Sequence, residues 1–306
     1  MIPNFPEFKN LEITDKVHIE SMTSKYQPYS DFNFVSMWSW NVNNKIQISK
    51  LHNNLILCFT DYVTQKLFYS FLGSDRVDET VQSLIDMSLK NNLSPVLRLM
   101  PEVSVENIDR TRFEVVEDID NFDYIYNVEE LRDLRGGKYS KKRNDFNSFI
   151  KKFPQAEARV IFLNDPLIVE GIIGLCDKWH GLKTEKGEDF GLCDLNAITR
   201  LLDSACNLKL LTVGVFLDNK LVAFFINELL DSDYVCAHMM KADVSIDPGL
   251  YTFLIKKSAE ILSSHNKKYI NYEQDLGIES LRIAKARLRP VYFLKKYLIR
   301  DIKNNY

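Results

Sequence analysis

Apolar and polar positions follow one another along the first half of the chain in segments typical of short strands and one long helix. Alternating or continuous apolar runs predict strands at 45–50, 55–60, 66–72, 94–100 and 113–126. Apolar residues at helical spacing predict a helix over 75–90, and a short helix is predicted over 104–109. The first half therefore contains strands and helices in alternation.

The second half has the same order of elements. Helices are predicted over 167–178, 194–206, 247–263 and 278–288, and strands over 209–217, 221–229, 234–240, 268–272 and 291–299. Asp218-Asn219 predicts a hairpin turn, and Asp247-Pro248 predicts a helix start with Asp as its cap. Each half thus has a strand, a hairpin, a strand, a helix, a strand, a helix and a strand. This order predicts two similar α/β modules, and one large mixed sheet is the alternative.

Composition and charge narrow the class of protein. Of the 306 residues, 45% are hydrophobic and 26% are charged, which is typical of a globular protein. A formal net charge of −3 argues against a general nucleic-acid coat protein but allows a local basic patch. No apolar run approaches the roughly 18–20 residues of a membrane helix, and MIPNFPEFKN does not have the pattern of a signal peptide. We expect a cytoplasmic protein without integral membrane association.

Cysteines and histidines indicate neither a disulfide framework nor a metal site. The five cysteines are widely spaced without a C-x-x-C pair, which fits a reducing compartment. The five histidines form no H-x-x-x-H or H-E-x-x-H motif. His238 lies in an apolar strand, and we interpret it as a core histidine rather than a base.

The first of two basic segments is LRDLRGGKYSKKRNDFNSFIKKF, residues 131–153. Gly136-Gly137 breaks the preceding turn, and a helix is predicted to start near Lys138. Apolar residues at i, i+3, i+4 and i+7 predict one buried stripe, formed by Phe146, Phe149, Ile150 and Phe153.

The cations of this predicted helix fall into two groups. Tyr139 and Lys142 lie on the apolar stripe, and Arg143 lies at its edge. Lys141 and Lys152 lie on the opposite face and are interpreted as solvated charges. Inward cations at a helix start indicate an anion site, which we expect in a cleft between the two halves. The alternative is that Lys142 and Arg143 pair with acidic side chains or reach solvent.

The second basic segment, YINYEQDLGIESLRIAKARLRPVYFLKKY, spans residues 269–297. A strand ends at Glu273-Gln274-Asp275 before a predicted helix, which is the usual place for ligands in α/β folds. The alternative is that Asp275 caps the helix and that Glu273 neutralises Lys285 or Arg289. The predicted apolar face of this helix is Ile278, Leu281, Ala284 and Leu288.

Three stretches together resemble a known family: GGKYSKKRNDFNSFIKKF, AHMMKADVSIDPGLY, and the second basic segment. They are similar to the C-terminal domain family of phosphatidylglycerol lysyltransferases, and YSDFNFVSMWSW, residues 29–40, matches its amino-terminal motif. The resemblance implies an α/β (α+β) fold of two tandem GNAT-like (acyl-CoA N-acyltransferase-like) domains, with mixed sheets flanked by helices. Applied to this chain, it implies a domain 1–130, a basic connecting helix 131–154 and a domain 155–306.

The resemblance also points to site residues: Lys138, Tyr139, Lys142, Arg143, Asn144, His238, Lys241, Gly249, Tyr251, Asn271, Glu273, Asp275, Gly277, Lys285, Arg289 and Pro290. Among these, Glu273 and Asp275 are candidate bases or binders of a cationic aminoacyl group, and Tyr139 and Lys241 are candidate hydrogen-bond donors. The candidates for phosphate binding are Lys138, Lys142, Arg143 and Arg289.

These residues predict an acyl or aminoacyl transferase whose donor is a charged tRNA or another phosphate-bearing compound, with an amine or hydroxyl acceptor. Acyl-CoA is disfavoured because Asp247-Pro248 at a helix start removes an amide donor and adds negative charge where pyrophosphate would bind. Two alternatives remain: a non-catalytic binding module on the same fold, and an acyl-CoA-dependent N-acyltransferase.

Overall fold

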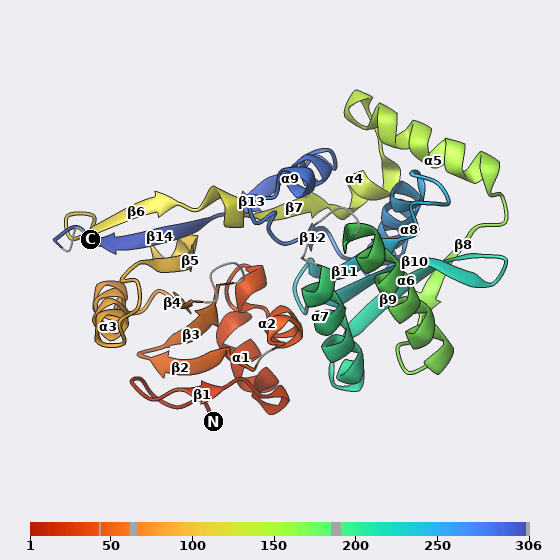
Figure 1. The fold of residues 1–306 in the computed structure, drawn as a ribbon. Helices are drawn as coiled ribbons and strands as arrows, with labels where there is room; N and C mark the ends of the chain where they lie inside the picture. The colour runs from red at the N-terminus through yellow and green to blue at the C-terminus, as the bar shows by residue number, and fades with distance from the viewer. Residues whose placement is uncertain (43, 62–65, 185–190, 304–306) are drawn as a thin grey trace. The chain divides into compact units, whose positions relative to one another are not determined.

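The structure is a computed structural model that describes residues 1–42, 44–61, 66–184 and 191–303 (Figure 1). The chain forms two compact units, each of which is described by itself. The first contains residues 1–124, 274–283 and 293–306, and the second contains 125–273 and 284–292. No helix in the described part of the chain is long and apolar enough to span a membrane.

The first unit has a four-stranded sheet in the order β1-β2-β3-β4 and a three-stranded sheet in the order β5-β14-β6. The strands are β1 (Lys9–Asn10), β2 (Gln47–Leu51), β3 (Asn54–Thr60), β4 (Leu67–Leu72), β5 (Leu97–Pro101), β6 (Phe113–Glu117) and β14 (Lys296–Asp301). The helices are α1 (Lys16–Thr23), α2 (Phe34–Trp40) and α3 (Val77–Lys90), with short 3-10 turns at Ile13–Asp15, Ser30–Phe32, Glu102–Ser104 and Ile119–Asn121.

Helix α3 shows why the local pattern predicts this unit well. Its apolar positions, among them Val81, Leu84 and Ile85, are fully buried, as the helical spacing predicts. They pack in one core with Phe71 of β4 and Ile299 of β14. The core of the first unit therefore includes a residue of β14, the last strand along the chain.

The second unit is built on a seven-stranded sheet in the order β13-β7-β12-β11-β10-β9-β8. The strands are β7 (Asp123–Asn127), β8 (Glu157–Ile161), β9 (Leu210–Leu217), β10 (Lys220–Leu229), β11 (Tyr234–Ala242), β12 (Tyr269–Asn271) and β13 (Tyr292–Leu294). The helices are α4 (Val128–Asp133), α5 (Ser140–Lys152), α6 (Pro166–Thr184), α7 (Gly191–Asp203) and α8 (Leu250–Ser264), with 3-10 turns at Gly137–Tyr139 and Ala205–Asn207. Helix α9 (Glu279–Ala286) has its residues 279–283 in the first unit and 284–286 in the second.

The hairpin of β9 and β10 lies between β11 and β8 in this sheet. Asp218 and Asn219 both have left-handed backbone, with φ of 49° and 63°, which is the conformation that a tight hairpin turn requires. Strand β10 is buried at every position from 221 to 228 because α6 and α8 cover the two faces of the sheet (Figure 1). The predicted hairpin is confirmed.

Each unit contains three consecutive antiparallel strands followed by a helix and a strand. In the first unit these are β2, β3, β4, α3 and β5, and in the second they are β9, β10, β11, α8 and β12. The repeated element order seen in the sequence is therefore present. The division at residues 130–131 and 154–155 stays a prediction.

Four details of the predicted elements are wrong. The strand predicted over 113–126 is two strands, β6 and β7, in different sheets, because a turn at Asp118 and Asn121 separates them. The strand predicted over 291–299 is likewise divided into β13 and β14. Residues 104–109 form no helix beyond the turn Glu102–Ser104. The predicted apolar face of α9 is not buried as a whole, since Leu281 is 39% exposed.

Candidate functional site

Two ionisable side chains are buried within the strands β10 and β11. Glu228 is 2% exposed and His238 is 7% exposed. The register between the strands shifts so that His238 has no residue opposite it on β10. His238 is therefore the extra residue of a β-bulge, which takes its side chain out of the regular alternation of the strand.

Glu273 follows β12 in a turn that several hydrogen bonds fix. Its φ is 59°, a left-handed conformation that is uncommon for a residue with a Cβ. The Glu273 N–H donates to the side-chain oxygen of Asn271 at 2.7 Å, and Nζ of Lys285 donates to the carbonyl oxygens of Tyr272 and Glu273 at 2.6 and 3.1 Å. The acidic residue predicted at this strand end is thus held in a defined place.

The buried imidazole of His238 lies between two carboxylates. Its Nε2 is 3.5 Å from Oε2 of Glu228, and its Nδ1 is 3.6 Å from Oε1 of Glu273. Burial alone would lower the pKa of His238, but the two carboxylates outweigh burial and raise this pKa to about 9. The Glu273 side chain is 19% exposed, against 3% for Glu228. Glu273 is therefore the carboxylate that solvent reaches, with an imidazolium behind it at neutral pH.

Lys241, a candidate hydrogen-bond donor, lies on β11 beyond His238. Its ammonium is 3.3 Å from the centre of the Trp179 ring on α6, a cation–π contact. The neighbouring Lys178 donates to Asp243 at 2.7 Å. Helix α6 is therefore attached to the end of β11 through two adjacent residues.

The first basic segment joins the turn after α9 through Tyr139. The Tyr139 hydroxyl lies 3.1 Å from a carboxylate oxygen of Glu130 and 3.3 Å from the carbonyl oxygen of Leu288. Burial and Glu130 raise the pKa of Tyr139, so this hydroxyl stays protonated. Lys138 is exposed and forms an ion pair with the same carboxylate at 2.7 Å.

Arg143 stabilises the loop before α5. Its Nη1 donates to the carbonyl oxygens of Leu134 and Gly136, the latter at 2.7 Å. Leu134 and Gly136 have left-handed backbone, with φ of 52° and 83°. The partners of Arg143 are thus backbone carbonyls rather than the carboxylates considered as the alternative. Its role in an anion site stays a prediction.

Lys142 is half-buried and has no hydrogen bond or ion pair among the residues that the structure describes. Burial lowers its pKa, and the charges of Arg287 and Lys141 lower this pKa further, against the effect of Asp145. Arg289 is exposed, and its charge acts on Tyr139. Cations from both basic segments therefore meet beside the start of α5. We call Lys138, Lys142, Arg287 and Arg289 the basic cluster.

One side chain at the end of α5 differs from the prediction, and another has a contact that was not predicted. Lys152 is exposed, as predicted, but it also donates to the buried Asp247 at 2.6 Å and lowers the pKa of that carboxyl. Ile150 is 38% exposed, whereas Phe149 is fully buried. The aromatic contacts of α5 with α8 run from Phe146 and Phe149 to Phe253, and Phe153 packs against Phe149, so Ile150 is the member of the predicted stripe that is exposed.

The start of α8 is closely covered by α5. The N–H of Gly249 donates to Oδ1 of Asp247 at 2.7 Å. A Cβ at Gly249 would lie 2.8 Å from the backbone oxygen of Asp145. The amide that would bind a pyrophosphate at this helix start is therefore occupied by a carboxylate, beside the backbone of α5.

Asp275 belongs to the first unit and is 1% exposed. It accepts hydrogen bonds from the Tyr124 hydroxyl at 2.5 Å, from the Gly277 N–H at 2.8 Å, and from two nitrogens of Arg282 at 2.9 Å. Burial would raise its pKa, but the bonds from Arg282 and Tyr124 outweigh burial and lower it. These bonds favour the alternative interpretation of Asp275 as a residue that fixes the turn before α9.

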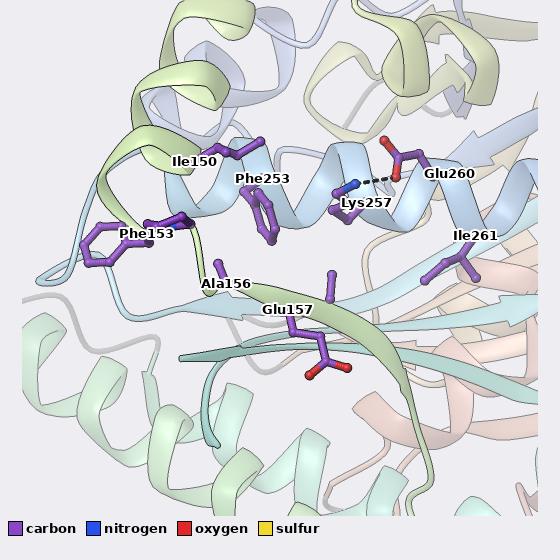
Figure 2. A pocket seen from close by; sticks show the side chains of 10 residues that line it. Ile150, Phe153, Ala156, Glu157, Phe253, Lys257, Glu260 and Ile261 are labelled. Carbon is purple, nitrogen blue, oxygen red and sulfur yellow. Dashed lines mark hydrogen bonds and ion pairs between the residues drawn. The ribbon is translucent and has the colours of Figure 1, made fainter. Parts of the chain in front are cut away.

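A hollow of about 380 Å³ lies between the end of α5, α8 and β8 (Figure 2). Apolar side chains such as Ile150, Phe153 and Phe253 line it, with the ion pair of Lys257 and Glu260 at its side. None of the predicted site residues lines this hollow. In the described ranges, no group of His, Cys, Asp and Glu side chains is arranged to hold a metal ion.

Sequence reasoning missed Glu228 and Trp179. The signal for Glu228 was present, since it is a charged residue near the end of the long apolar run LVAFFINELL. Trp179 had no such signal because its contact with Lys241 joins a helix to a strand far along the chain.

Comparisons with known structures give the same fold. A conserved protein of unknown function from Bacteroides thetaiotaomicron VPI-5482 is 27% identical, with 98% of this chain and 99% of that chain covered and a TM-score of 0.83. The C-terminal domain of a putative lysylphosphatidylglycerol synthetase from Agrobacterium fabrum is 12% identical, with 94% and 92% covered and a TM-score of 0.66. L-PGS from Bacillus licheniformis is 13% identical, with 100% and 95% covered and a TM-score of 0.65. No curated protein matches the sequence.

The predicted α/β fold class is confirmed: the chain has a mixed α/β fold with several sheets flanked by helices. The sequence family described as "Phosphatidylglycerol lysyltransferase, C-terminal" matches residues 23–300. Because this match covers more than half of the 306 residues, the chain belongs to the phosphatidylglycerol lysyltransferase C-terminal family.

Proposed function

We propose that the chain transfers an acyl or aminoacyl group from a phosphate-bearing donor, for which a charged tRNA is the best candidate, to an amine or hydroxyl acceptor. The observation that carries this proposal is the Glu273 carboxylate, which is partly exposed and lies 3.6 Å from a buried imidazolium. Family membership supports the class of reaction, and the basic cluster supports the proposal of a phosphate-bearing donor.

In the proposed reaction, the acceptor amine or hydroxyl attacks the carbonyl carbon of the aminoacyl ester. The Glu273 carboxylate takes the proton that the acceptor loses. The bond from the carbonyl carbon to the terminal tRNA oxygen then breaks, and this oxygen takes the proton held by Glu273 and leaves as a hydroxyl group. Lys241 is a candidate donor to the oxyanion that forms between these steps. The products are the acylated acceptor and uncharged tRNA.

The test of this function uses radiolabelled lysyl-tRNA, because the family is named for lysyl transfer. The purified chain is incubated with this donor and with either phosphatidylglycerol vesicles or a mixture of soluble amines. Label in an acceptor, dependent on the chain, would support the proposal and identify the acceptor class. Tight binding of lysyl-tRNA without any transfer would instead establish a binding module.

Lys142→Ala is expected to weaken tRNA binding and to reduce its dependence on salt. A lysine that makes one phosphate contact contributes about one unit to the slope of log affinity against log salt concentration. Filter binding at several salt concentrations measures this slope. The matched control is Lys151→Ala, which removes an exposed cation from the same helix. Equal slopes for the two variants would contradict the proposal that the basic cluster binds the phosphates of the donor.

Acetyl-CoA is expected to show no binding in the low micromolar range by isothermal titration calorimetry. The physical reason is the start of α8, where the Asp247 carboxylate accepts from the Gly249 amide and α5 packs closely. Because a carboxylate repels pyrophosphate, the helix start cannot act as an anion site. Low-micromolar binding would favour the acyl-CoA-dependent N-acyltransferase over tRNA-dependent transfer.

A further inference from the structure

Glu228, His238 and Glu273 form a row with the imidazole between the two carboxylates. This row contains more charged groups than a single general base needs. Two of its members are almost completely buried, with side-chain exposures of 3% for Glu228 and 1% for His238. Ionisable groups buried without solvent are costly unless they compensate one another. This chain nevertheless buries an imidazole and a carboxylate in β10 and β11, behind a carboxylate that solvent reaches. The burial of these two charged groups needs an explanation.

The backbone is irregular at both residues of the contact between His238 and Glu273. His238 is the extra residue of the bulge in β11, and Glu273 has left-handed backbone directly after β12. Strands β11 and β12 are parallel neighbours, with Cys236 opposite Asn271. Regular strands would continue past this point with alternating side chains. The two irregularities instead bring Nδ1 of His238 to 3.6 Å from Glu273.

We infer that His238 and Glu228 are positioning residues that hold the Glu273 carboxylate in one orientation for acyl transfer. This inference rests on the proposed function. The imidazolium attracts the carboxylate of Glu273, and the carboxylate of Glu228 balances the imidazolium from its other side. When Glu273 takes the proton of the acceptor, the remaining pair of His238 and Glu228 is neutral. The buried pair is thus neutral before and after this step, and the one net negative charge of the row lies on Glu273, the carboxylate that solvent reaches.

Other charged groups near β11 are engaged elsewhere. Lys285 of α9 donates to the backbone oxygens of Tyr272 and Glu273. From the helices that pack on β11, Lys178 of α6 donates to Asp243 and Ser245, and Lys256 of α8 donates to Glu260 and to a backbone oxygen. Lys241 on β11 lies over Trp179. Among the described residues, Glu228 and Glu273 are the charged groups that act on the pKa of His238.

The first experiment is an NMR titration of the histidine side chains in the full chain, with the His238 signal assigned from His238→Gln. The pKa of His238 is expected near 9, as the structure gives. In Glu228→Gln and in Glu273→Gln it is expected to fall by about one unit or more, which corresponds to about a tenfold loss of proton affinity. A His238 midpoint at or below the ordinary histidine value of about 6.5 would overturn the inference.

The second experiment separates positioning from a purely structural role. Glu228→Gln is expected to lower kcat of lysyl transfer by about tenfold or more, because a misplaced reacting group loses rate, while the affinity for lysyl-tRNA stays unchanged. Thermal unfolding checks that the variant is folded, and if it is not, the titration of Glu273→Gln alone decides. Unchanged kcat in folded Glu228→Gln would overturn the inference. The titration needs no activity, so absence of transfer with a normal titration would count only against the proposed function.

Discussion

Glu273→Gln is expected to lower the rate of acyl transfer by about 10²–10⁴-fold, the usual contribution of a general base. Glutamine has nearly the same shape, so the turn held by Asn271 and Lys285 should persist. What the variant loses is the ability to take a proton. Initial rates of lysyl transfer from labelled lysyl-tRNA, at saturating donor, measure the effect as kcat.

The same variant distinguishes the two roles that the sequence left open for Glu273. If the carboxylate is the base, kcat falls and KM for the donor changes little. If it binds a cationic aminoacyl group, KM rises and kcat is largely kept. The matched control is Glu279→Gln, which removes an exposed carboxylate in the first turn of α9. A loss of rate as large in the control as in Glu273→Gln would show a general effect of charge and exclude a specific base.

The local elements could be predicted from the sequence because their signals are local. The hairpin at Asp218-Asn219 and the helix α3 depend on turn residues and apolar spacing within a few residues. The division of 113–126 into β6 and β7 could not be predicted, because it depends on distant pairing. Strand β6 pairs with β14 at the other end of the chain, and β7 pairs with β12.

Part of the candidate site was predictable because its signals are also local in the sequence. The position of Glu273 after a short strand and before a helix marks it as a candidate, and the structure places it beside a charged partner. That this partner is His238 depends on the bulge in β11, which the sequence does not reveal. The helical spacing of α5 predicted that Lys142 points inward, and its side chain is half-buried. It could not show that Arg143 reaches the carbonyl groups of the preceding loop, or that Lys152 reaches Asp247.

The first unit contains a buried ion cluster that no sequence pattern indicated. The Lys296 ammonium is fully buried on β14, donates to Asp123 at 2.7 Å and contacts the carboxylate of Asp31. The Ser30 hydroxyl donates to Asp123 at 2.6 Å. Burial alone would lower the pKa of Lys296, but Asp123 and Asp31 outweigh burial and raise it. The stabilisation from this lysine is therefore fully present at neutral pH and is lost only as the pH rises through the raised pKa.

Lys296→Met is expected to lower the free energy of unfolding by about 3–5 kcal/mol, because it leaves two buried carboxylates without their cation. Urea unfolding at pH 7, followed by circular dichroism, measures the change. The matched control is Lys295→Met, the adjacent exposed residue, whose ion pair with Glu117 should contribute less than about 1 kcal/mol. A loss no larger than that of the control would show that water or another cation compensates these carboxylates.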